Sequence, residues 1–204
     1  MSALLRRLRD DEGGFTLVEM VVAIAVLGIL FAIYSLVLSG TIRDSSTVED
    51  QGVAQAEVRA AVDGLAQDFR QAYTGDSSGT LTPIGAISGT TVTFYSPDRQ
   101  TPFHLRQIQY QLTGGTLQRR VALSTNTNGY PWTFGAFTSW VTVASNITNS
   151  TVFTGKYLDT SGNVVTTTTP SQVSGLWIAV TISPRGSQGR TYSYSSSASV
   201  RAAQ

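Results

Sequence analysis

The side chains that could perform catalysis are few and scattered along the chain. The sequence has no cysteine and one histidine, His104, which has neither a Ser/His/Asp spacing nor a cluster of metal-ligand residues beside it. The stretch Asp159-Thr-Ser-Gly-Asn163 suggests a calcium loop, but it lacks the carboxylate count and the final glutamate of the usual site. We therefore expect a turn at residues 159–163, a surface or strand position for His104, and no catalytic residue, metal or cofactor.

Two further groups of side chains could bind a ligand. The pair Arg119-Arg120 could contact phosphate or an acidic partner, but such a pair beside a hairpin is usually a solvated strand face. The tryptophans could form a stacking platform for a glycan or a nucleic acid, but aromatic residues in strands more often belong to the core. We predict neither a specific nucleic-acid ligand nor a small-molecule ligand. The tryptophans are Trp132, Trp140 and Trp177.

Composition limits the architecture and the function class. The chain has 204 residues, of which 41% are hydrophobic and 13% are charged, so it suits one modest globular domain with an appendage. Its 14 basic residues balance 13 acidic residues, so net charge gives no field that would attract nucleic acid or an acidic substrate.

One carboxylate, Glu19, occupies a distinctive position at the edge of an apolar run. Residues 20–42 carry no formal charge, and residues 20–38 are long enough as a helix to cross a bilayer core. A carboxylate costs about 2.5 to 3.5 kcal/mol at the centre of a membrane helix and less near the interface, so it generally has a partner. A signal peptide, or an uncleaved anchor with its arginine-rich end in the cytoplasm, would leave Glu19 as an interfacial bystander.

The residues around Glu19 offer a more specific interpretation. The stretch "GGFTLVEMVVAIAVLGILFA" follows a short charged leader, and its glycines, aromatic residue, glutamate and apolar helix resemble the type IV prepilin signature. The resemblance implies that prepilin peptidase cleaves after Gly14 and N-methylates Phe15. It also implies that Glu19 pairs with the N-terminal amine of a neighbouring subunit.

The resemblance further implies a location and a set of partners. The chain would cross the cytoplasmic (inner) membrane once, with its N-terminus cytoplasmic and its C-terminal domain outside. It would lie in membrane lipid before assembly, and afterwards in a periplasmic or extracellular filament. Its partners would be other major and minor pilins or pseudopilins and the inner-membrane assembly platform.

A second helical pattern follows the apolar run. Apolar residues recur at spacings of three and four, which predicts an amphipathic helix packed on a soluble domain. They are Val58, Val62, Leu65, Phe69 and either Ala72 or Tyr73. Glycines 40, 52 and 64 each weaken a helix by about 1 kcal/mol, so a bend or local break is expected.

The C-terminal part has the composition of β-structure. "RQIQYQLTGGTLQRRVAL" predicts a hairpin around Gly114-Gly115, and further strands are expected at 90–96, 140–144, 151–158, 176–183 and 191–200. The expected fold is α+β and pilin-like, with a long N-terminal helix covering one face of a mainly antiparallel sheet. The predicted divisions are a leader at 1–14, a membrane and assembly helix at 15–38, an amphipathic helix at 39–75 and a β-rich domain at 76–204.

The soluble part narrows the resemblance and leaves two function classes. Stretches including "AAVDGLAQDFRQA", "VSGLWIAVTI" and "SASVRAAQ" are similar, in this order, to minor pseudopilins of the type II secretion J family and related type IV minor pilins. Leu36 replaces the kinking proline of many major pilins, and a C-terminal cysteine pair is absent. We expect a non-enzymatic subunit of a type IV pilus, competence pseudopilus or secretion pseudopilus. The alternative is a β-domain adhesin for glycan or DNA on an uncleaved tether.

Overall fold

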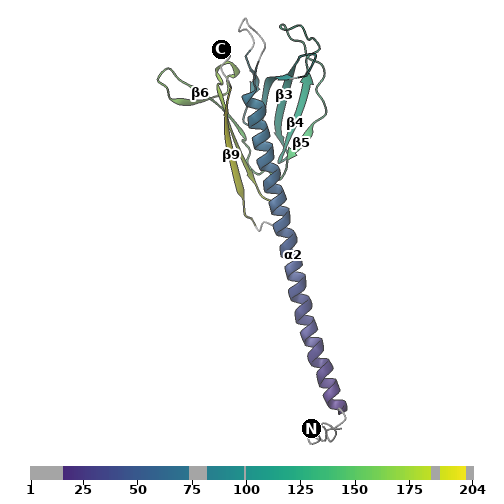
Figure 1. Cartoon of the computed structure of the whole chain (residues 1–204). Helices are drawn as coiled ribbons and strands as arrows, with labels where there is room; N and C mark the ends of the chain where they lie inside the picture. Colours follow the sequence, from purple (N-terminus) through teal and green to yellow (C-terminus); the bar gives the residue numbers. More distant parts are fainter. Residues whose placement is uncertain (1–15, 74–81, 99, 185–188, 201–204) are drawn as a thin grey trace, which may run out of the picture. The chain divides into compact units, whose positions relative to one another are not determined.

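The computed structural model describes residues 16–73, 82–98, 100–184 and 189–200, as one long helix followed by antiparallel strands (Figure 1). This confirms the α+β, pilin-like class. The chain divides into two compact units, Met1–Ser46 and Thr47–Gln204. Helix α2 extends from Leu17 to Arg70 and contributes residues to both units.

The N-terminal unit consists, in its described part, of helix alone. Every described side chain from residue 16 to residue 46 is exposed, and this helix is long and apolar enough to cross a membrane. The helix is continuous through Gly40, Gly52 and Gly64, so the expected break does not occur. Each glycine costs about 1 kcal/mol of helix stability, but a break would also cost hydrogen bonds of the long flanking helical runs. The helix therefore stays continuous.

The second unit contains two antiparallel sheets. The first has the order β1-β2-β3-β4-β5, and the second the order β7-β6-β8-β9. In the first sheet the strands are β1 (Ile84–Ile87), β2 (Thr91–Asp98), β3 (His104–Thr113), β4 (Thr116–Leu123) and β5 (Val141–Ala144). In the second they are β6 (Phe153–Leu158), β7 (Val164–Thr167), β8 (Gly175–Ile182) and β9 (Tyr192–Ser199), with a short 3₁₀ helix, η1 (Pro170–Gln172), before β8.

The predicted hairpin is confirmed as β3–β4. Thr113 pairs with Thr116, and the two residues between them, Gly114 and Gly115, have φ values of 55° and 73°. A two-residue turn with positive φ at both positions matches the twist of the flanking strands, which is why two glycines connect them.

The apolar stripe of α2 forms the centre of the core. Val58, Leu65 and Phe69 are fully buried, and the rings of Phe69 and of Phe94 on β2 form a T-shaped pair at a centroid distance of 5.4 Å. The same helix contacts the second sheet, because the hydroxyls of Tyr192 and Tyr194 on β9 donate to its glutamines 51 and 55. The helix therefore packs against both sheets rather than one face of a single sheet (Figure 1).

The helix ends at Arg70, before the predicted limit at residue 75. Its last turn tightens, because the N–H of Ala72 donates to the carbonyl of Phe69 at 2.9 Å. The N–H of Tyr73 then donates to the carbonyl of Tyr95 on β2 at 2.8 Å. Ala72, and not Tyr73, is therefore the last buried residue of the stripe.

Candidate functional site

The site defined by the sequence lies at the start of α2. Thr16 precedes the first helical residue, and its hydroxyl oxygen accepts a hydrogen bond from the backbone N–H of Glu19 at 3.3 Å. The same hydroxyl can donate to the Glu19 carboxylate at 3.5 Å. A threonine cap with glutamate three residues later is a helix-start pattern, and a carboxylate in the first turn interacts favourably with the helix dipole.

Thr16 is a site residue that the sequence interpretation missed, although its signal, T-x-x-E within "FTLVE", was present. The cap holds the helix start, while the carboxylate of Glu19 remains exposed. An exposed carboxylate at the end of an apolar helix can form an ion pair with a cation on another molecule. The two other predicted site residues, Gly14 and Phe15, lie outside the described residues.

Comparison with known proteins supports this interpretation of the N-terminus. Residues 9–35 match the family model described as the prokaryotic N-terminal methylation motif. The matched range includes Gly14, Phe15, Thr16 and Glu19, and it ends before the first strand. No curated protein shows significant similarity to the chain. The N-terminal segment thus carries a prepilin-type motif, which supports a type IV pilin-like, membrane-anchored subunit.

The suspected calcium loop is a turn between β6 and β7, as expected. The backbone N–H groups of Asn163 and Ser161 donate to Asp159 Oδ1 at 2.8 and 2.9 Å. These hydrogen bonds hold the pKa of the exposed Asp159 carboxyl below its ordinary value, and the hydrogen bond from the backbone of Asn163 has the largest effect. Within the part of the chain that the structure describes, no group of three His, Cys, Asp or Glu residues could hold a metal ion.

His104 is the first residue of β3, in agreement with the expected strand position. Its Nδ1 donates to the backbone carbonyl of Ser124 at 2.8 Å, and the hydroxyl of Ser124 accepts from the N–H of Leu105 at 3.0 Å. These bonds join the start of β3 to the residue after β4. The imidazole therefore has a local structural partner.

The arginine pair differs from the predicted solvated strand face. Arg119 forms an ion pair with Asp68 of α2 at 3.0 Å, and the hydroxyl of Tyr110 donates to the same carboxylate oxygen at 2.9 Å. Arg120 points to the other side of β4, where its guanidinium lies 4.2 Å from the ring centroids of both Phe137 and Trp140. Successive side chains of a strand point to opposite faces of the sheet. Arg119 therefore anchors the helix, and Arg120 packs against the two aromatic rings.

The expectation that the tryptophans belong to the core is wrong. Trp132 and Trp140 are half-buried, and Trp177 on β8 is 37% exposed. In β8 the neighbours Leu176 and Ile178 face the core, so the strand period places Trp177 on the outer face. There the ammonium of Lys156 lies 4.6 Å from its ring centroid.

Proposed function

We propose that this chain is a structural subunit of a type IV pilin-like filament, which acts by assembly and not by catalysis. The observation that carries the proposal is the prepilin-type motif at residues 9–35, which includes the first part of a helix whose described side chains are exposed up to residue 46. An apolar helix segment whose described side chains are all exposed suits lipid first and neighbouring helices later.

The proposed sequence of events begins with processing. Prepilin peptidase removes residues 1–14 and methylates the new N-terminal amine of Phe15. Before assembly the helix spans the membrane with its N-terminus cytoplasmic and its β-rich unit outside. Glu19 then lies near the interface, where its charge is tolerated.

Assembly gives Glu19 its partner. When apolar helices pack together the local dielectric falls, which strengthens an ion pair and raises the cost of an unpaired amine. The carboxylate of one subunit can then neutralise the Phe15 amine of its neighbour. We propose other pilins or pseudopilins and an inner-membrane assembly platform as the partners of this step.

The finer class that we propose is a minor pilin or pseudopilin. Two sequence features support it: Leu36 stands where many major pilins have a kinking proline, and no cysteine is available to close a C-terminal loop. The machine served would be a type IV pilus, a competence pseudopilus or a type II secretion pseudopilus.

Glu19→Gln tests the proposal, because glutamine retains the capping pattern but removes the charge. Asp44→Asn, on an exposed carboxylate further along the same helix, is the matched control. Co-purification with partner pilins is measured at equal membrane abundance. We expect both variants to insert and lose the leader, and only Glu19→Gln to lose partner pilins. Equal recovery from both variants would favour an anchored binding protein instead.

A further inference from the structure

The outer face of the second sheet is rich in hydroxyl groups. Burial alternates along β8 and β9, so every second residue of these strands points away from the core. Within the four described strands of this sheet, Lys156 is the one charged side chain on that face. The face therefore offers many hydrogen-bonding groups and little charge. Its hydroxyl side chains include Thr154, Thr181, Ser193, Ser195, Ser197 and Ser199.

Trp177 lies at the centre of this face. In the strand register it pairs with Thr154 on β6 and with Ser197 on β9. The face of its exposed indole carries partial negative charge, which attracts the weakly positive C–H groups of a sugar ring. The hydroxyl side chains on both sides can exchange hydrogen bonds with sugar hydroxyls. An exposed indole between hydroxyl groups therefore suits a carbohydrate.

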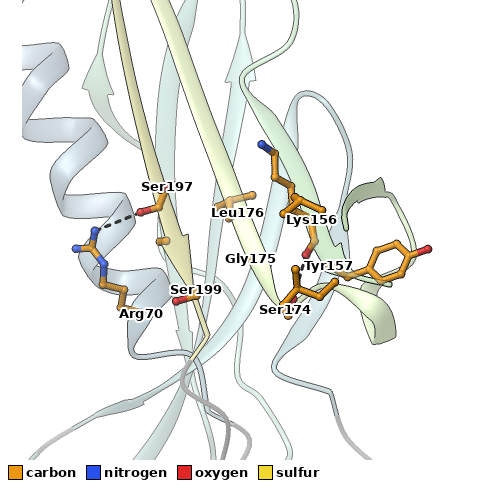
Figure 2. A pocket seen from close by; sticks show the side chains of 11 residues that line it. Arg70, Lys156, Tyr157, Ser174, Gly175, Leu176, Ser197 and Ser199 are labelled. Carbon is orange, nitrogen blue, oxygen red and sulfur yellow. Dashed lines mark hydrogen bonds between the residues drawn. The ribbon is translucent and has the colours of Figure 1, made fainter. Parts of the chain in front are cut away.

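A groove adjoins the indole, because Lys156 lines the groove and also contacts the Trp177 ring. Its volume is about 320 Å³, within the range of small-ligand sites, which is roughly 300 to 1,000 Å³. Figure 2 shows Arg70 and Lys156 on opposite sides of Gly175 in this groove. The groove thus places two cationic side chains next to the hydroxyl-rich face.

Both cations are available to an anionic ligand. Neither Arg70 nor Lys156 forms an ion pair with a described carboxylate. Arg70 donates one hydrogen bond to the carbonyl of Ser197 at 3.3 Å, and its guanidinium has further N–H groups. The ammonium of Lys156 lies 4.6 Å from the Trp177 ring centroid, a contact that is weak at an exposed site. A carboxylate can therefore bind either cation without breaking an existing ion pair.

Gly175 keeps the floor of the groove open. Its φ is not among the positive values that favour glycine. A Cβ at this position would lie 3.5 Å from the carbonyl oxygen of Ala198 and 4.0 Å from Cβ of Lys156, both ordinary van der Waals contacts. The backbone can therefore carry a larger residue here, and such a residue would fill the groove.

We propose that this face binds an acidic polysaccharide, with a uronate sugar on Trp177 and carboxylates at Arg70 and Lys156. The indole and the hydroxyl groups match the sugar rings. The two cations match the carboxylates that recur along such a polymer, and charge-assisted hydrogen bonds to arginine are strong. The inference goes beyond the proposed function, since it assigns a ligand to a subunit that otherwise acts by assembly.

A nucleic acid fits the same surface less well. Nucleic-acid binding depends on many lysine and arginine contacts with phosphates. The described part of this face and its groove provides Arg70 and Lys156, and the formal net charge of the whole chain is +1. Hydroxyl groups predominate instead, and they match a polymer of sugar rings.

Binding to uronate polymers tests the proposal. Dissociation constants of the full-length chain in detergent are measured on immobilised polygalacturonate and alginate, at one salt concentration. Three controls separate the contributions: dextran has sugar rings without charge, polyglutamate has carboxylates without sugar rings, and single-stranded DNA has phosphates and bases. We expect a uronate polymer to bind more tightly than each control by a factor of about 10 or more, because it engages both the cations and the indole.

Three substitutions locate the site. Trp177→Ala should weaken binding to the uronate polymer by a factor of about 2 to 10, the range for an aromatic contact. Arg70→Gln should weaken it by a factor of about 10 or more, since hydrogen bonds to a charged group are lost. Gly175→Val fills the groove without changing charge and should also weaken binding. The matched controls, which should bind normally, are Tyr130→Ala, an exposed aromatic residue outside the second sheet, and Arg59→Gln, an exposed arginine on α2.

Urea midpoints show which variants are folded, and Trp177→Ala, on an exposed side chain, decides the outcome if Gly175→Val is not. The proposal is overturned if neither uronate polymer binds, if polyglutamate binds equally well, or if Trp177→Ala has no effect. Tighter binding of DNA would also overturn it and would assign the face to nucleic acid. Glu19→Gln should bind the polymer normally, so this proposal and the assembly role can fail separately.

Discussion

Asp68 should contribute measurably to the stability of the second unit, because one of its oxygen atoms connects three elements. Its Oδ2 accepts from Tyr110 on β3 at 2.9 Å and from Nη2 and Nε of Arg119 on β4 at 3.0 and 3.1 Å. Hydrogen bonds to a charged group are worth about 1.5 to 3 kcal/mol and neutral ones about 0.5 to 1.5. Asp68→Asn keeps an acceptor but loses the charge, so we expect a loss of about 1 to 2 kcal/mol. Asp68→Ala leaves the Tyr110 hydroxyl unpaired, so we expect this substitution to lower the free energy of unfolding by about 2 to 4 kcal/mol.

Urea unfolding of the full chain in detergent, followed by tryptophan fluorescence, measures these losses. Asp63→Asn is the matched control, since this carboxylate is exposed on the same helix and should change stability by no more than about 0.5 kcal/mol. A double-mutant cycle with Arg119→Gln should show a coupling between the two residues. If Asp68→Asn is no less stable than Asp63→Asn, the cluster does not stabilise the junction between helix and sheet.

Three further predictions address processing, autonomy and pH. Replacement of Gly14 by a bulky residue should retain the leader and prevent entry into filaments, as a mobility shift on gels would reveal; normal processing would contradict the prepilin interpretation. A truncated chain that begins at Ser45 should unfold cooperatively with mixed helix and strand dichroism, because the buried stripe and all the strands follow it; a disordered fragment would contradict the boundary. Burial, and then Asp68, raise the pKa of Tyr110, so the folded state retains this proton above pH 10.0, the ordinary value. Stability should therefore fall as pH rises beyond that value, and urea midpoints should fall less steeply for Tyr110→Phe; equal slopes would count against this cause.

Local patterns explain what could be predicted from the sequence. The apolar run, the helical stripe and the Gly114-Gly115 turn each depend on residues within a few positions of one another. Strands β1 and β7, with four residues each, were missed, although the equally short β5 was predicted. The T-x-x-E cap at Thr16 is also a local pattern, and it could have been predicted from the sequence.

Contacts between distant residues could not be predicted in this way. Asp68 and Arg119 are 51 residues apart, so no local spacing connects them. The packing of the two sheets depends on close approaches such as that at Gly155 on β6, where a Cβ would lie 2.9 Å from Cδ1 of Ile87 on β1. The outer position of Trp177 depends on which face of β8 meets the core.

The most direct test of the proposed assembly role is the chemical identity of the mature N-terminus. Mass spectrometry of the N-terminal peptide, from the full chain extracted from its own membranes, would measure it. We predict a chain that begins at Phe15 and carries a methyl group on the amine. A chain that still begins at Met1, with an unmodified Gly14-Phe15 bond, would contradict it.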